Sequence, residues 1–308
     1  MKPIMTATAE SIEQAKKLLL VGVDRLYIGD ETFALRVPSA LSKDEIAEIT
    51  ALAHAAGKTV TVAVNALMHV EKMALIRPYL DFLQSIKVDR ISVGDAGVVY
   101  ILQTEGYALP YSYDASTMVA SARQVNFWAQ QGAVEAVLAR ELPKIELSEM
   151  AKELEIPGEL LLYGATVIHH SKRPLLQNYF NFIQNDSAQK DQAHYHFIAE
   201  PSDNDSHYSI FEDSHGTHIF ANDDLDMLPA FSELTEMGYT HFKLDGIFTR
   251  GDAFVEIAKS FIEAKNEIAS GAVSADKLAE LDTHVRALHP ENRTLSRGFY
   301  DIDPETIK

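Results

Sequence analysis

The sequence predicts an α/β fold, a (β/α)₈ TIM-like barrel of eight parallel strands that alternate with helices. Short apolar segments alternate with amphipathic ones along about 270 residues, which favours parallel pairing and right-handed crossovers. Residues 59–65 are apolar and β-branched almost throughout, as is typical of a strand buried on both faces. A doubly wound open sheet is the alternative, but the turn after the first strand, at residues 6–11, contains no glycine for a phosphate loop.

Local signals mark the ends of several helices. Ser11 is a good N-cap, Ser42 and Glu45 have the spacing of a capping box, and Gly57 can end the second helix. We expect strands at residues 2–8, 25–29, 59–65, 90–94, 111–115, 136–139, 159–163 and 240–244. The helices are expected at residues 12–20, 46–56, 73–86, 97–105, 120–131, 145–154, 228–237 and 252–270.

The repeat is interrupted between the seventh and eighth units. Residues 164–226 are polar and aromatic, with only short strand-like pieces at 208–212 and 217–220, and they predict an irregular excursion. We therefore expect one barrel domain over residues 1–271, including this excursion. Residues 272–308 are expected to form a C-terminal tail with a short helix, packed on the barrel.

Composition excludes several classes of chemistry. The 308 residues include no cysteine, so a disulfide scaffold, a thiol nucleophile and a self-contained iron–sulfur cluster are excluded. No segment has the roughly 20 apolar residues of a membrane span, and no secretion signal is recognisable, so we expect a cytoplasmic protein. The net charge of −18 disfavours unaided binding of a large RNA, although acidity alone also serves solubility.

Polar residues follow most of the expected strands, where a barrel places its active site. They are Asp30, Asn65, Asp95, Asp114, Arg140, Glu141, Tyr163, Lys243 and Asp245. We predict catalytic roles for Asn65, Asp114, Glu141 and Asp245, because carboxylates and amides orient polar groups and carboxylates move protons. Arg140 and Tyr163 are predicted to bind substrate. Two alternatives stay open: a role for Asp95 as a helix cap alone, and a structural ion pair between Arg140 and Glu141.

The sequence contains many histidines, but their spacing does not favour a metal site. His169 and His170 are adjacent and would point to opposite sides of an extended chain, and His215 and His218 could chelate only from a turn. We assign no metal site and expect structural or hydrogen-bonding roles. Walker, nucleophile-elbow and HExxH motifs are absent from the sequence.

A family resemblance emerges at residues 160–179, LLLYGATVIHHSKRPLLQNY. The segment resembles the signature of the collagenase-like peptidase family U32, matching it at Gly164, Ala165, Ser171, Arg173, Leu175, Leu176, Asn178 and Tyr179. Further matches are VAVNALMH (62–69), LARELP (138–143), FKLDGIF (242–248) and NRTLSRGFY (292–300). Tyr163 replaces the histidine of the motif, and Val167 and Pro174 replace its two cysteines.

The resemblance implies a function. The chain looks most like the shorter of two paired bacterial paralogues implicated in 5-hydroxylation of the tRNA wobble uridine, a reaction linked to prephenate. It implies a paralogous partner subunit, tRNA contacted through the complex, and Arg173 as a substrate-binding residue for a carboxylate or phosphate. Without the motif cysteines the chain would be the cluster-free subunit. A structural ion pair for Arg173, a collagenase-like peptidase and a non-catalytic partner-stabilising subunit are the alternatives.

Overall fold

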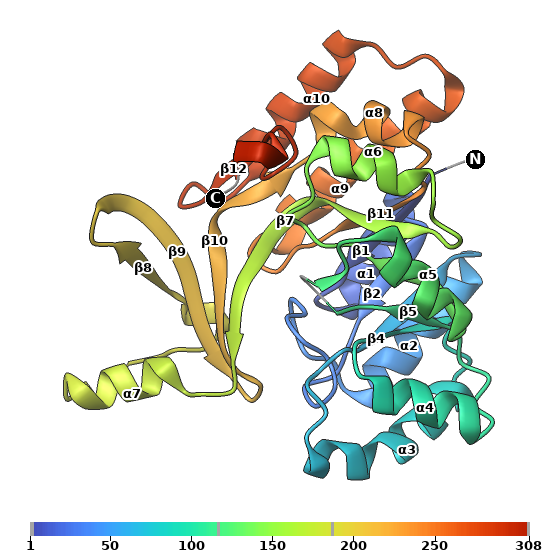
Figure 1. The fold of residues 1–308 in the computed structure, drawn as a ribbon, viewed down its shortest axis with the longest axis vertical. Helices are drawn as coiled ribbons and strands as arrows, with labels where there is room; N and C mark the ends of the chain where they lie inside the picture. The colour runs from blue at the N-terminus through green and yellow to red at the C-terminus, as the bar shows by residue number, and fades with distance from the viewer. Residues whose placement is uncertain (1–2, 116–117, 186–187, 307–308) are drawn as a thin grey trace.

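A closed barrel of eight parallel strands forms the body of the protein, as the sequence predicts (Figure 1). The computed structural model describes residues 3–115, 118–185 and 188–306. The barrel strands are β1 (Ile4–Thr8), β2 (Arg25–Ile28), β3 (Thr59–Val64), β4 (Arg90–Val93), β5 (Tyr111–Tyr113), β6 (Ala133–Val137), β7 (Gly158–Ser171) and β11 (His241–Leu244). Each pairs with the next in order, and β11 closes the barrel by pairing with both β7 and β1.

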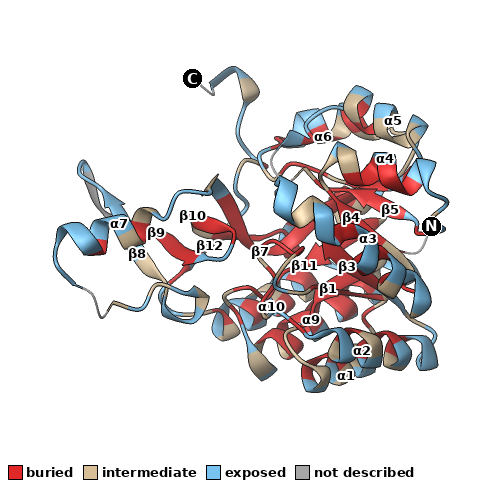
Figure 2. Cartoon of the chain, turned by 90° about the horizontal axis from the view of Figure 1, so that it is seen from below, coloured by how far each residue is buried: buried red, intermediate tan, exposed pale blue. Residues whose placement is uncertain are grey.

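Helices surround the barrel and cover its apolar outer face (Figure 2). They are α1 (Ile12–Val21), α2 (Lys43–Ala55), α3 (Val70–Ser85), α4 (Ala96–Thr104), α5 (Ala122–Gln130), α6 (Lys144–Ala151), α8 (Phe231–Glu236) and α9 (Gly251–Ser270). The predicted caps are confirmed: Ser11 accepts from the backbone N of Gln14, and Ser42 with Glu45 forms the capping box. The main hydrophobic core therefore lies between strands and helices.

The inside of the barrel, by contrast, is ionic. The carboxylate of Glu135 lies 2.9 Å from Arg25 and 2.8 Å from Arg90, and it also pairs with His241. Burial would raise the pKa of Glu135, but the hydrogen bond from His241 and the nearby guanidinium groups hold it well below its ordinary value. Removing one of these charged side chains would leave a buried charge unpaired. The ionic network therefore holds together the strands that contribute to it.

The excursion is an antiparallel sheet rather than the irregular segment that the sequence predicts. Strand β7 continues past residue 163 to Ser171 and leaves the barrel (Figure 1). There it pairs with β10 (Gly216–Asp226), followed in the sheet by β9 (Asp203–Asp213) and β8 (His196–Glu200). Helix α7 (Leu175–Phe182) and the 3₁₀ turn η2 (Gln192–His194) belong to the same part. The expected pieces at 208–212 and 217–220 lie inside β9 and β10.

The C-terminal residues pack against both parts. After the 3₁₀ turn η3 (Leu228–Ala230) and the last barrel unit, α10 (Ala275–Leu288) packs on α9, and β12 (Thr294–Ser296) pairs with β10. The short turn η4 (Pro304–Thr306) follows. Arg293 forms a buried ion pair with Asp224 that anchors this segment to β10. Among the described residues, no helix has the length and apolar character needed to span a bilayer.

Candidate active site

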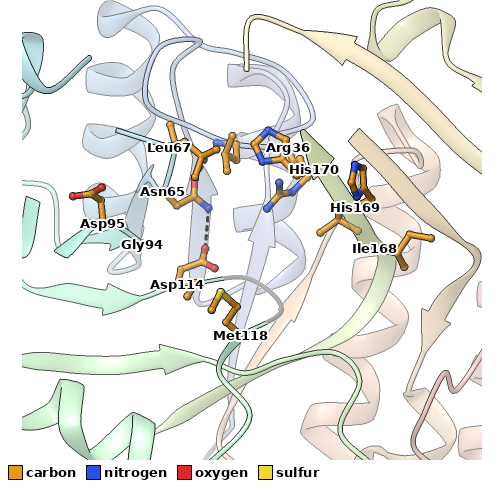
Figure 3. A pocket seen from close by; sticks show the side chains of 14 residues that line it. Arg36, Asn65, Leu67, Gly94, Asp95, Asp114, Met118, Ile168, His169 and His170 are labelled. Atoms are coloured by element: carbon orange, nitrogen blue, oxygen red, sulfur yellow. Dashed lines mark hydrogen bonds between the residues drawn. The ribbon is translucent and has the colours of Figure 1, made fainter. Parts of the chain in front are cut away.

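Asn65 and Asp114 meet at the mouth of the barrel, each directly after its strand (Figure 3). Nδ2 of Asn65 donates to Oδ2 of Asp114 at 2.8 Å, and Oγ of Ser92 donates to the same oxygen at 2.9 Å. Oδ1 of Asn65 accepts from the backbone N of Leu35 at 2.9 Å. Because that N–H can only donate, the amide orientation is fixed and its NH₂ group faces the carboxylate.

Two glycines allow the strand ends to approach so closely. A Cβ on Gly94 would lie 2.6 Å from the backbone oxygen of Asp114. Gly164 has a φ of +123°, and a Cβ there would lie 2.4 Å from the backbone oxygen of Asp245. The glycine of the motif at residues 160–179 therefore lets β7 pass against the loop that carries Asp245.

Positive side chains outnumber carboxylates at the mouth. Arg36, Arg140 and Lys243 line a small void there together with Asp114 and Asp245. Burial lowers the pKa of Arg36, and the neighbouring guanidinium of Arg140 lowers it further. Three cations against two carboxylates give this void the character of an anion site.

Other groups hold these charges in place. A guanidinium N–H of Arg140 donates to the backbone oxygen of Ala165, and the ammonium of Lys243 lies 3.5 Å from the centroid of the Tyr27 ring. The Tyr27 hydroxyl accepts from Nδ2 of Asn65 at 3.3 Å. Burial and the nearby Asp114 raise the pKa of Tyr27 well above its ordinary value, so the ring stays a neutral phenol.

A larger cavity of about 260 Å³ opens beside the void and shares Arg36, Asn65 and Asp114 with it. Figure 3 shows Asn65 and Asp114 on one side and Ile168 and His169 of β7 on the other. The remaining wall is mixed, with apolar and polar side chains: Leu35, Ala66, Leu67, Gly94, Asp95, Ala115, Met118, Val167 and His170. The cavity thus suits a ligand with a partly apolar body and an anionic group.

His170 contributes a neutral imidazole to this cavity. Its ring stacks on that of His218 at 4.6 Å between centroids, and its Nε2 lies 3.2 Å from the backbone oxygen of His215. Burial, with His218 beside it, lowers the pKa of His170 to about 4. His218 in turn bonds the carboxylate of Asp213 at 2.9 Å. Within the described chain, no group of three or more histidine or carboxylate side chains is arranged to hold a metal ion.

The structure brings together four of the seven predicted site residues and leaves three elsewhere. Asn65, Asp114, Arg140 and Asp245 line the mouth. Glu141 is exposed and lines neither cavity, and no ion pair with Arg140 occurs within the described residues. Tyr163 is fully buried, with its hydroxyl 2.7 Å from Nδ1 of His289 and 2.8 Å from Oγ1 of Thr249. Arg173 is exposed on the excursion, before α7.

Sequence reasoning missed Arg36 and His170 as site residues. Arg36 lies in the loop between β2 and α2, away from any strand end, with a left-handed φ of 54°. The loop contains no motif that would have identified it. His170 would have been found if the seventh strand had been extended to Ser171, because residues 167–170 of β7 all line the cavity. Asp95 caps α4, accepting from the backbone N of Gly97 at 2.7 Å, although it also borders the cavity.

Comparison with known proteins identifies relatives of this chain. The tRNA hydroxylation protein P2 of Bacillus subtilis is 28% identical over 302 residues, which are 97% of each of the two proteins. The tRNA hydroxylation protein P1 of the same organism is 24% identical over 80% of this chain and 58% of its own length. Similarity to P2 therefore runs through barrel, excursion and tail alike.

A solved structure shows the same fold. The U32 peptidase Mk0906 aligns with a TM-score of 0.51 at 14% identity, over 79% of this chain and 92% of its own. The model of peptidase family U32 matches residues 10–308, nearly the whole sequence. The resemblance first seen at residues 160–179 thus extends across the molecule, and the chain belongs to peptidase family U32.

Proposed function

We propose that this chain takes part in 5-hydroxylation of the tRNA wobble uridine, together with a second U32 chain. The observation that carries the proposal is the similarity to tRNA hydroxylation protein P2, which covers 97% of both sequences. Similarity over the full length includes the mouth of the barrel and the excursion beside it. The alignment thus spans the segments of this chain from which the candidate site is built.

The charges at the mouth support this role. Arg36 and Arg140 are placed to bind an anionic group, either the carboxylate of a cosubstrate such as prephenate or a phosphate of the RNA. Asp114 is held by Asn65 and Ser92 as a hydrogen-bond acceptor that can orient a donor group of the substrate. Asp245 lies across the void, with Oδ1 accepting from the backbone N of Ile247 at 3.1 Å.

The paired relatives support a partner subunit. Two proteins named for tRNA hydroxylation, P1 and P2, occur in Bacillus subtilis, and this chain is similar to both. The absence of cysteine means that any iron–sulfur cluster needed for the reaction would be held by the other chain. Co-expression of this chain with a cysteine-containing paralogue, followed by affinity purification through one tag, should recover both chains in fixed ratio.

The test of the function is made in cells. Deleting the gene, along with any parallel hydroxylase, should remove 5-hydroxyuridine derivatives from bulk tRNA, and the wild-type gene should restore them. If a site variant such as Arg140→Gln restores them as well as the wild type, the chain only stabilises its partner. If deletion changes nothing and the purified chain cleaves gelatin, the peptidase alternative replaces the proposal.

A further inference from the structure

Two cationic side chains, Lys72 and Lys172, lie together beside the cavity, and Arg173 is the next residue in the chain; we call these three residues the cationic ridge. Nζ of Lys72 lies 2.7 Å from Nδ1 of His215, and Nζ of Lys172 donates to the backbone oxygen of Ser214 at 3.2 Å. Because Ser214 and His215 are consecutive, the two ammonium groups are neighbours. Burial and the charge of Lys172 both lower the pKa of Lys72. Arg173 follows Lys172 directly and is exposed.

The carboxylates of Asp213 and Asp30 lie near Lys72 and interact with its charge, but neither forms an ion pair with it within the described chain. Most other lysines and arginines in the described chain pair with carboxylates, as Lys58 does with Asp24. Within that described part, none of the three ridge residues forms an ion pair. The neighbouring carboxylate of Asp213 is engaged by Nε2 of His218 and by the backbone N of His215. On a chain of net charge −18, a local group of three cations attracts a polyanion to one place, while the rest of the surface repels it.

His215 fixes the cationic ridge at the barrel mouth. Since a lysine ammonium can only donate, Nδ1 of His215 is the acceptor and its Nε2 carries the proton, which it donates to the backbone oxygen of Glu31 at 2.8 Å. Burial and the charge of Lys72 lower the pKa of His215 to about 4, so the ring stays neutral. The turn between β9 and β10 is thereby tied to α3 and to the loop after β2.

The cavity and the cationic ridge adjoin each other along β7. His169 and His170 line the cavity, and Lys172 lies two residues beyond His170 in the chain. The rim also carries apolar side chains that remain open to solvent, with Leu67 49%, Met118 70% and Ile168 45% exposed. Aliphatic surface of this kind suits the face of a nucleobase that has left its stack.

We infer that the cationic ridge binds the phosphates of a single-stranded RNA loop whose unstacked nucleotide enters the cavity. The inference rests on the proposed function and adds the surface that holds the RNA. Lys72, Lys172 and Arg173 contact the sugar–phosphate backbone, so they supply affinity without reading sequence. The mouth residues, which include Arg36 and Asp114, lie deeper and act on the nucleotide.

The test compares two triple variants that remove the same charge, in the complex with the paralogous partner. The ridge variant is K72Q/K172Q/R173Q. The control is K87Q/K152Q/K259Q, whose lysines are exposed elsewhere on the molecule. Binding of a fluorescein-labelled tRNA transcript is followed by anisotropy over a series of KCl concentrations. Loss of three phosphate contacts should reduce the salt slope by about 2 and weaken binding at 0.1 M salt by roughly 100-fold. The control should keep the wild-type slope.

Each further outcome has a defined meaning. Equal slopes for the two triple variants, or no binding by the wild-type complex at low salt, overturn the inference. Ridge-dependent binding to phosphatidylserine vesicles with none to tRNA assigns the surface to a membrane and also overturns it. The proposed function is judged separately, by whether the wild-type gene restores hydroxyuridine in the deletion strain. Ridge-dependent tRNA binding without that restoration would keep the RNA surface and remove the hydroxylation role.

Discussion

The side-chain amide of Asn65 donates to the carboxylate of Asp114 at 2.8 Å, joining the ends of β3 and β5 across the barrel mouth. The same amide accepts from the backbone N of Leu35, so it also fixes the loop between β2 and α2 directly before Arg36. One residue thus positions both a carboxylate and a guanidinium of the candidate site.

Replacing this amide should impair both stability and function. Asn65→Ala removes a partner from Asp114 and from the buried N–H of Leu35, which we expect to cost about 1–3 kcal/mol in the free energy of unfolding. Hydroxyuridine restored in cells should fall at least about tenfold, because the site loses its alignment. Urea unfolding and nucleoside mass spectrometry measure the two effects. Asn126→Ala, which removes a partly exposed amide with two backbone hydrogen bonds, is the control and should retain function.

The paired guanidinium groups are expected to bind an anion jointly. Arg36→Gln and Arg140→Gln should each lower the hydroxyuridine content of tRNA about tenfold or more, because a neutral amide loses the charge-assisted hydrogen bonds. Arg140→Lys should retain only part of the hydroxyuridine content, since an ammonium group cannot form the bidentate hydrogen bonds of a guanidinium. Arg123→Gln, on the exposed face of α5, provides a control for lost charge. Full function in both Arg36→Gln and Arg140→Gln would exclude the mouth as the anion site.

The effect on stability of the close contact between Gly164 and Asp245 can be distinguished from the effect of backbone strain. Gly164→Ala should destabilise the fold by about 1–3 kcal/mol from the left-handed backbone, with a further loss from the 2.4 Å clash. Gly238 has a φ of +104° but nothing within 4 Å of an added Cβ. Gly238→Ala therefore reports strain alone. Equal losses of unfolding free energy in the two variants would mean that the strand and the Asp245 loop are not tightly packed.

Buried Asp226 predicts a loss of stability as the pH rises from about 4 to about 7. Burial and a hydrogen bond to Asp282 raise the pKa of Asp226 to about 7. Because this folded-state pKa exceeds the ordinary value near 4, the protonated carboxyl stabilises the fold at low pH, and that contribution is lost as pH rises through 7. Asp226→Asn keeps a neutral group that can still accept from the backbone N of Leu228. Its unfolding free energy should vary less between pH 5 and pH 8 than that of the wild type, and an unchanged pH profile would contradict this assignment.

Much of the fold could be predicted because local patterns agree with it. The alternation of apolar strands with capped helices predicts the barrel, and the strand ends then predict Asn65, Asp114, Arg140 and Asp245 as neighbours. These four residues follow from topology alone, because the carboxyl ends of parallel strands meet at one face.

The remainder depends on tertiary context. Beyond Val167 the residues of β7 are only partly buried, and most of them are polar. Their sequence therefore predicts a loop, although their backbone stays paired with β10. Arg36 reaches the site through a left-handed turn in a loop whose path no periodic pattern defines. Tyr163 lies inside β7, which continues to Ser171, and its side chain points into the core toward His289, a partner 126 residues away.

The role of this chain is tested most directly by mass spectrometry of tRNA nucleosides from a strain lacking this gene and any parallel hydroxylase. We predict that 5-hydroxyuridine derivatives disappear, that the wild-type gene restores them, and that Arg140→Gln, expressed at the same level, does not. Undiminished 5-hydroxyuridine derivatives in the deletion strain, or full restoration by Arg140→Gln, would contradict the role assigned to this chain and to its barrel mouth.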